Sequence, residues 1–212
     1  DILGAAVEAQ VDPTTTHVVV RTHATDPRAA PRRTEKTLQG IAYGLWLVSQ
    51  AWVDEVVRAR RHVPEAPYEI MRVLGSHADA STLKNDAPRR ARLGRQGNRR
   101  ILRQYRVRVV LRGTFADTPG LPKTPSKHLL RSLLQSAGAR VVGSMSELGR
   151  DENDRRVVVC HSAPDVPADL MGAVAVSAAW VLDCISNYSL RDPGDAAYAV
   201  PALPHDPSRS SS

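Results

Sequence analysis

The side chains that could do chemistry in this 212-residue sequence form none of the common catalytic patterns. It contains no phosphate-binding loop of the G-x-x-x-x-G-K-[ST] type, no G-x-S-x-G nucleophile motif and no H-E-x-x-H zinc motif. The seven histidines are scattered, and the acidic residues show no paired placement that would suit acid and base catalysis. We therefore expect a chain that is not an enzyme and uses no cofactor.

Cysteine and histidine also fail to form a metal site. Cys160 and His161 are neighbours, but nothing near them supplies a second ligand pair at the spacing of a zinc site. Cys160 and Cys184 both lie in apolar stretches. The expected state is two reduced thiols in the core, with no disulfide and no metal.

A run of arginines in the middle of the chain carries much of the net charge of +7. It consists of Arg89, Arg90, Arg92, Arg99, Arg100, Arg103, Arg106 and Arg108. One interpretation is binding to nucleic acid or to an acidic partner through phosphate contacts. The other is a solvated linker and strand edge, with side chains that reach into water. Aromatic residues that would stack on bases are scarce in the run, which favours the second interpretation.

One pattern, V-S-x-x-W-V, occurs in both halves of the chain, at residues 48–53 and 176–181. Ser49 and Ser177 suit the N-cap of a helix, and a Trp then falls in the first turn. An apolar stripe with helical spacing follows in each copy: Trp52, Val53, Val56 and Val57 in the first, and Trp180, Val181, Cys184 and Ile185 in the second. Two such copies indicate that one fold is present twice.

The residues upstream of each copy indicate strands. Residues 16–20 and 156–160 are β-branched runs long enough for a buried strand. Before them, the stretches around Gly4 and Gly138 resemble a helix that ends at a glycine and runs into a strand. Strands that alternate with helices favour an α/β fold with parallel sheets.

Composition sets the expected domain boundaries. We expect a first repeat at 1–70, a linker with the basic segment at 71–100, a second repeat at 101–201 and a disordered tail at 202–212. No run of about 18 apolar residues could cross a membrane, and the start of the sequence does not look like a signal peptide.

Together, these motifs resemble the BRCT domain family. The resemblance rests on Arg33-Thr34-Glu35-Lys36 leading to G-I-A-Y-G at 40–44, on W-L-V-S leading to W-V in the first repeat, and on V-S-A-A-W-V-L-D at 176–183. It implies two BRCT repeats packed head to tail, each a small parallel four-stranded sheet flanked by helices. The tandem resembles that of a RING-type ubiquitin ligase subunit most, and that of the subunit's RING partner second.

The family's tandem repeats bind phosphoserine peptides, which gives several residues an implied role. Thr34 and Lys36 stand where the family places a hydroxyl and a cation to hold the phosphate. Arg33 matches an arginine that holds the peptide backbone. The wall of a groove that reads a side chain three residues after the phosphoserine is implied at Leu38, Thr118 and Leu182. From spacing alone, Thr34 would be a plain helix cap and Lys36 a solvated lysine, and Leu38 and Leu182 could be plain core.

Two departures from the family pattern limit this expectation. Leu38 replaces a Phe and Thr118 replaces a Met, so the side-chain preference of the groove is open. The chain begins near the end of the family's first helix, so the first repeat is expected to lack its opening strand and most of that helix. The loss of two phosphate donors that come with them should weaken phosphate binding.

The resemblance also implies a setting. It is that of a nuclear protein of the DNA damage response, whose partners are phosphorylated repair proteins and whose parent is a RING ligase subunit. The alternative is a chromatin or DNA scaffold. There Asp165, in the H-S-A-P-D stretch, would contact a ubiquitinated nucleosome and the basic linker would contact DNA. A structural pairing module is a third possibility.

Overall fold

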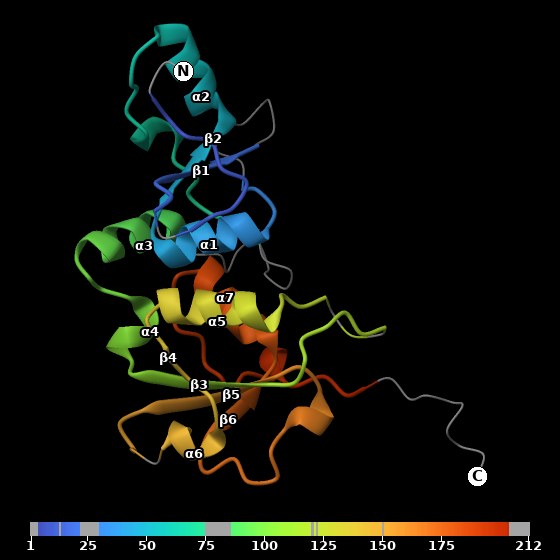
Figure 1. Ribbon diagram of the computed structural model, residues 1–212. Helices are drawn as coiled ribbons and strands as arrows, with labels where there is room; N and C mark the ends of the chain where they lie inside the picture. The colour runs from blue at the N-terminus through green and yellow to red at the C-terminus, as the bar shows by residue number, and fades with distance from the viewer. Residues whose placement is uncertain are drawn as a thin grey trace. The chain divides into compact units, whose positions relative to one another are not determined.

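The computed structural model describes residues 4–12, 14–21, 30–74, 86–119, 121, 123–149 and 151–203, and it divides into two compact units (Figure 1). Unit 1 comprises Asp1–Ile101 and Leu182–Leu190, and unit 2 comprises Leu102–Val181 and Arg191–Ser212. The two copies of the Trp helix begin in different units, α2 (Gln50–Ala59) in unit 1 and α7 (Ala178–Ser186) in unit 2.

Unit 1 is built around a parallel pair of strands. Its elements are β1 (His17–Val20), α1 (Glu35–Tyr43), β2 (Trp46–Ser49), α2 (Gln50–Ala59), the short η1 (Ala66–Tyr68) and α3 (Ala87–Gln96). β1 and β2 pair in parallel from His17 opposite Trp46 to Val20 opposite Ser49. Leu47 and Val48 of β2 are completely buried. α1 is therefore the crossover between two neighbouring parallel strands.

The expected strand at Ala5–Val7 is not formed. Gly4 has the left-handed φ of +65° that ends many helices, but the residues after it are irregular and Val7 is 97% exposed. In unit 2 the equivalent strand hydrogen-bonds only to the central strand of its sheet. The described residues of unit 1 contain no counterpart of that central strand. A strand without a partner cannot satisfy its backbone groups, so this part of the expectation is wrong for the chain as described.

The basic segment at 87–96 forms a helix, α3, that packs on α1 and β2. Its Arg92 donates two hydrogen bonds to the buried carboxylate of Glu69, at 2.9 and 3.1 Å. The same guanidinium lies 3.5 Å from the ring centre of Trp46. This arginine, which the sequence placed in a solvated linker, is therefore part of the interior of unit 1.

Unit 2 contains a four-stranded parallel sheet in the order β4-β3-β5-β6. Its elements are α4 (Ile101–Gln104), β3 (Val107–Arg112), α5 (Lys127–Ser136), β4 (Arg140–Val142), α6 (Met145–Leu148), β5 (Arg155–Cys160), η2 (Ala163–Asp165), β6 (Val174–Val176), the first half of α7 (Ala178–Ser186) and η3 (Ala196–Tyr198). The first residue of α4 and the second half of α7 belong to unit 1. Figure 1 shows α5 on one side of this sheet and α6 on the other. The predicted parallel α/β fold is confirmed here.

The two Trp helices repeat each other in detail. The Trp52 Nε1–H donates to the Val63 carbonyl at 2.8 Å, and the Trp180 Nε1–H donates to the Arg191 carbonyl at 3.0 Å, each eleven residues further on. Trp52 is 7% exposed and Trp180 is fully buried. Each Trp therefore anchors the start of its helix and the chain that follows it.

The copies differ in how much of the stripe they bury. All four stripe residues of α7 are completely buried, whereas Val57 of α2 is 56% exposed, so the expected burial of Val57 is wrong. Ser49 occupies the N-cap of α2, but its hydroxyl makes no capping hydrogen bond. Cys160 and Cys184 are free and buried, as expected, and burial raises the pKa of the Cys160 thiol to about 11.

Candidate functional site

The start of α1 offers hydrogen-bond donors to an anion. Thr34 is the N-cap, and its Oγ1 accepts a hydrogen bond from the Thr37 backbone N–H at 3.3 Å. In return, the Thr37 Oγ1 accepts from the Thr34 backbone N–H at 2.8 Å. Within the described residues, the backbone N–H groups of Glu35 and Lys36 have no acceptor. The positive end of a nine-residue helix and two open donors together suit an anion.

Side chains at the same helix end add a hydroxyl and a charge. Thr34, Glu35 and Lys36 are all exposed, whereas Thr37 is buried at 2% exposure. The Thr37 hydroxyl donates to the Thr34 carbonyl at 2.8 Å, so the Thr34 hydroxyl hydrogen can point outward. The structure therefore places the predicted hydroxyl and the predicted cation on one accessible turn. Glu35 brings a negative charge that a phosphate at this turn must also face.

Arg33 precedes this turn and is held by an acidic partner. Its Nη1 donates to the Asp183 Oδ1 at 2.6 Å, and the two side chains are 9% and 12% exposed. Both residues belong to unit 1, although 150 positions separate them in the sequence. An arginine fixed in this way keeps its direction, which is what a residue that positions a peptide requires.

The role of Asp183 was missed at the level of sequence. Asp183 is the last residue of the V-S-A-A-W-V-L-D pattern, where it stood only as part of a helix. A buried arginine needs a counter-charge, and that need alone was a signal for such a partner. Nothing in the spacing could have identified which acidic residue supplies it.

The expected groove residues are distributed over both units. Leu38 and Leu182 belong to unit 1 and are 4% and 8% exposed. Thr118 belongs to unit 2, where its hydroxyl lies 3.1 Å from the His161 Nε2. The His161 ring makes an edge contact with Phe115, with ring centres 5.5 Å apart. A groove formed by Leu38, Thr118 and Leu182 remains a prediction.

Asp165, the expected nucleosome contact, takes part in a local cap. Its Oδ2 accepts hydrogen bonds from the Ser162 backbone N–H at 3.1 Å and from the Ser162 hydroxyl at 2.8 Å. The side chain is half-buried beside Gly113, where an added Cβ would lie 2.6 Å from the same oxygen. The contact with a nucleosome stays a prediction, and the structure gives Asp165 a capping role as well.

The described residues hold no cluster of three or more His, Cys, Asp or Glu that could bind a metal ion. No helix among them is long and apolar enough to span a bilayer.

The fold and this helix end define the class of protein. The BRCA1 C Terminus (BRCT) domain model matches residues 2–57, and a second BRCT domain model matches residues 114–196. The chain therefore belongs to the BRCT family and carries two BRCT domains in tandem. Modules of this kind bind other proteins and are not catalytic.

The relatives specify the resemblance further. Over 187 residues, 84% of this chain, it is 31% identical to the breast cancer type 1 susceptibility protein homolog of Mus musculus, of which the match covers 9%. Over 213 aligned positions, 88% of this chain, it is 27% identical to BRCA1-associated RING domain protein 1 of Arabidopsis thaliana, of which the match covers 27%. The sequence motifs pointed to these two proteins, in this order.

A solved structure supports the fold. The fifth and sixth BRCT domains of Brc1 from S. pombe align with 86% of this chain and 82% of their own at a TM-score of 0.55 and 19% identity. At this identity, the likeness shows a shared tandem fold.

Proposed function

We propose that this chain is a phosphoserine-peptide-binding module and that the start of α1 holds the phosphate. The observation that carries the proposal is the set of donors on that turn: the Thr34 hydroxyl, the open N–H groups of Glu35 and Lys36, and the Lys36 ammonium. A phosphoserine carries nearly two negative charges and three acceptor oxygens, which match a cation, a hydroxyl and backbone donors at a helix N-terminus. Arg33, fixed by Asp183, is placed to hold the peptide backbone beside the phosphate.

The wider role follows from the relatives. Two BRCT domains similar to those of a breast cancer susceptibility protein and of a RING domain protein support a nuclear function in the DNA damage response. In this role the module recruits phosphorylated repair proteins to a RING ubiquitin ligase complex, whose ligase activity lies outside these residues.

The test is a titration with a fluorescent phosphoserine peptide library and its unphosphorylated twin. We expect phosphate-dependent binding that falls about 10- to 100-fold in Lys36→Met, because each charge-assisted hydrogen bond contributes about 1.5–3 kcal/mol. Lys127→Met is the matched control, since Lys127 is an exposed lysine in the first turn of α5, which Ser126 caps. Equal affinity for both libraries, or an equal loss in both variants, would overturn the proposal.

A further inference from the structure

Three arginines form a row across the sheet of unit 2. In the parallel register, Arg108 of β3 lies opposite Arg140 of β4 and opposite Arg156 of β5. Residues in register point to the same face of a sheet, and neighbouring strands are about 4.8 Å apart. Two positions further along, Val142, Val110 and Val158 form the matching apolar row and pack with Leu148 of α6. The arginine row is thus the charged amino end of a face that is otherwise core.

Like charges on directly opposite positions destabilise a sheet, so this row requires compensation. Arg108 pairs with the buried carboxylate of Asp154. Arg156 donates to the backbone carbonyls of Met171 at 2.8 Å and Gly149 at 3.3 Å. Arg140 is exposed, and its guanidinium has no partner among the described residues. The described groups of unit 2 therefore neutralise the positive charge of the arginine row only in part.

Two more arginines, Arg103 and Arg106, line a hollow together with Arg108 and Arg140 of the row. This hollow of about 230 Å³ is lined by the side chains of Arg103, Arg106, Arg108 and Arg140, with Asp154 as the single lining carboxylate. Arg106 is held in place by Asp154 and Asp151, at 2.9 and 2.7 Å. It has a left-handed φ of 50°, a conformation that costs a non-glycine residue about 1 kcal/mol and that often marks functional sites. Four guanidinium groups against the carboxylates of Asp154 and Asp151 leave the hollow with an excess of positive charge.

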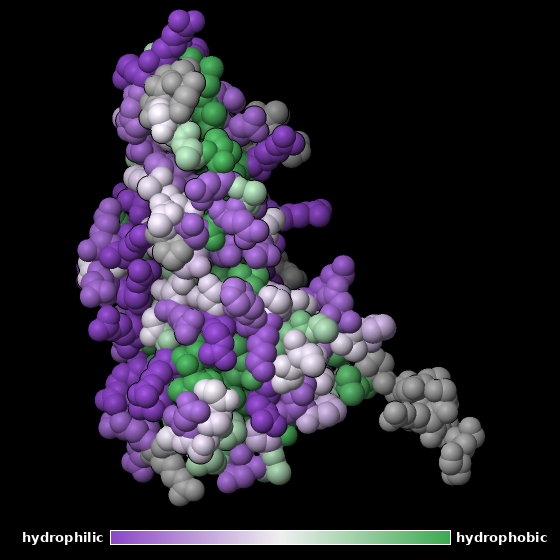
Figure 2. Space-filling model, viewed as in Figure 1, coloured by the Kyte–Doolittle hydropathy of each residue, from purple (hydrophilic) through white to green (hydrophobic). Residues whose placement is uncertain are grey.

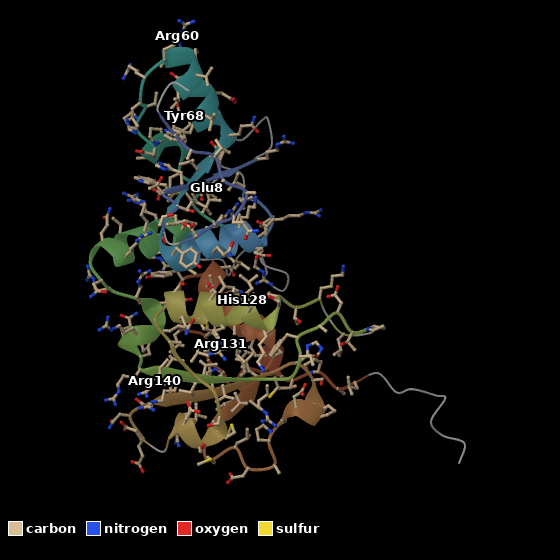
Figure 3. The ribbon with its side chains drawn as sticks, in the orientation of Figure 1. Glu8, Arg60, Tyr68, His128, Arg131 and Arg140 are labelled. Atoms are coloured by element: carbon tan, nitrogen blue, oxygen red, sulfur yellow. The ribbon has the colours of Figure 1, made fainter. Side chains whose placement is uncertain are left out.

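The position of Arg140, one of these arginines, can be followed in Figure 3. Figure 3 shows Arg140 at the start of β4, beside the beginning of β3. Figure 2 shows hydrophilic residues gathered where Figure 1 draws α4 and the start of β3. The surface is therefore accessible on the side where the arginine row ends.

We propose that this hollow and the arginine row bind the phosphate backbone of duplex DNA. Planar guanidinium forks match phosphate oxygens, and Arg140 at the end of the row and Arg103 beside it are exposed and have no partner among the described residues. A peptide would also need a pocket for a side chain, but Val107 is the only apolar residue that lines the hollow. Contacts between guanidinium groups and phosphates position a duplex and do not discriminate between base sequences.

The DNA site is separate from the phosphoserine site. The arginine row lies at the amino ends of β3, β4 and β5, whereas the start of α1 follows the carboxyl end of β1 in the other compact unit. The DNA proposal therefore stands whether or not α1 binds phosphoserine.

The test uses fluorescence anisotropy with the full chain and a labelled duplex of about 20 base pairs, at several salt concentrations between about 50 and 200 mM. The variant is Arg103→Gln with Arg140→Gln, because both side chains are exposed and neither has a partner among the described residues. We expect the affinity to fall about tenfold or more, and the slope of log K against log salt to become shallower by about 2.

A matched variant loses the same charge elsewhere. Arg61→Gln with Arg89→Gln removes two exposed arginines of unit 1 and should change the affinity less than about twofold. Lys36→Met should bind the duplex like the parent chain, and the thermal midpoint of every variant should stay within about 2 °C of it. The proposal would be overturned if the parent chain did not bind the duplex, or if the two arginine-pair variants lost equal affinity for it. It would also be overturned if Arg103→Gln with Arg140→Gln lost affinity for the phosphopeptide and kept its affinity for DNA.

Discussion

The two BRCT repeats cap equivalent crossovers with side chains of different charge. In each repeat, a crossover joins two neighbouring parallel strands: α1 joins β1 to β2, and the segment containing η2 joins β5 to β6. Both crossovers begin with a capping box, Thr34 with Thr37 in the first and Ser162 with Asp165 in the second. The first box is made of two neutral hydroxyls, and the second contains a carboxylate.

The charge of the cap decides which of the two crossovers can bind an anion. In the second repeat, Asp165 already supplies a negative oxygen that accepts two hydrogen bonds from Ser162. In the first repeat, the cap is uncharged, and Lys36 follows it on an exposed helical turn. Asp165 would repel a phosphate at the second cap, so we expect the repeated fold to hold one phosphate site, at the first cap.

The largest expected effect is the loss of stability when a buried charge of the first repeat loses its partner. β2 begins at Trp46, on which Arg92 stacks while it pairs with the buried Glu69. No ion pair among the described residues involves β6, the corresponding strand of the second repeat. Arg92→Met leaves the Glu69 charge buried and unpaired, so we expect a loss of about 3–5 kcal/mol in the free energy of unfolding, measured with urea.

The control for this prediction is an exposed pair of the same chemistry. Arg58 pairs with Glu55 on α2, three residues apart, and its side chain is 75% exposed. Arg58→Met should leave the free energy of unfolding unchanged within the error of the measurement, because an exposed ion pair contributes little. Similar losses for the two variants would mean that burial of the Arg92 pair has no energetic consequence.

The two tryptophans give the next effect in size. Trp180→Phe and Trp52→Phe each remove an Nε1–H that satisfies a backbone carbonyl and leave a small cavity, which should cost about 1–3 kcal/mol. Trp180 is fully buried, whereas Trp52 is 7% exposed and stacks on His17, so Trp180→Phe should cost more. Chemical unfolding of the two variants checks the order, and a larger loss for Trp52→Phe would contradict it.

The caps themselves come third. Asp165→Ala and Thr34→Ala each remove a side-chain acceptor at a helix start, which should cost about 0.5–2 kcal/mol. Asp165→Asn keeps an acceptor without the charge and should recover part of the loss. Thermal unfolding measures all three, and Asp165→Asn should leave phosphopeptide affinity unchanged. A gain or loss of phosphopeptide affinity in Asp165→Asn would place the second cap in the binding site.

The smallest effect is the pH dependence that Glu65 of the first repeat contributes to stability. Burial alone would raise the pKa of Glu65, but hydrogen bonds from its own backbone N–H, from His62 and from His17 outweigh burial and lower it. A lowered folded-state pKa stabilises the fold above the ordinary value of 4.5, and this stabilisation is lost as the pH falls below that value. The difference in unfolding free energy between the parent chain and Glu65→Gln should therefore shrink from about pH 5.5 to about pH 3.5. A constant difference would show that Glu65 makes no pH-linked contribution.

Local patterns predicted the elements well. The strands at 17–20 and 155–160 and the Trp helices follow from β-branched runs and helical spacing, which depend on neighbours in the sequence. The end of α1 at Gly44 was also predictable. Its φ is +66°, and an added Cβ would lie 2.8 Å from the Ala91 carbonyl oxygen.

Long-range pairings could not be predicted in the same way. The arginine run appeared uniform in the sequence, but folding places Arg92 in the interior and leaves Arg103 and Arg106 around an open hollow. The Arg33–Asp183 pair and the arginine row depend on chain crossings and strand register, which periodicity does not encode. For the same reason, the sequence could not show that Ala5–Val7 is not a strand, because a strand forms only where a second strand pairs with it.

α7 has a consequence for dissecting this protein into pieces. The helix starts in unit 2 at Ala178 and ends in unit 1, to which Leu182–Leu190 belongs. In unit 1, Asn187 and Tyr188 accept hydrogen bonds from Arg90 through their carbonyls, at 2.7 Å each. A fragment cut after residue 101 would lack these acceptors and the Asp183 that holds Arg33. Protease cleavage near position 182 should thus damage unit 1 as well as unit 2, and substitutions near position 183 can impair a site formed near position 34.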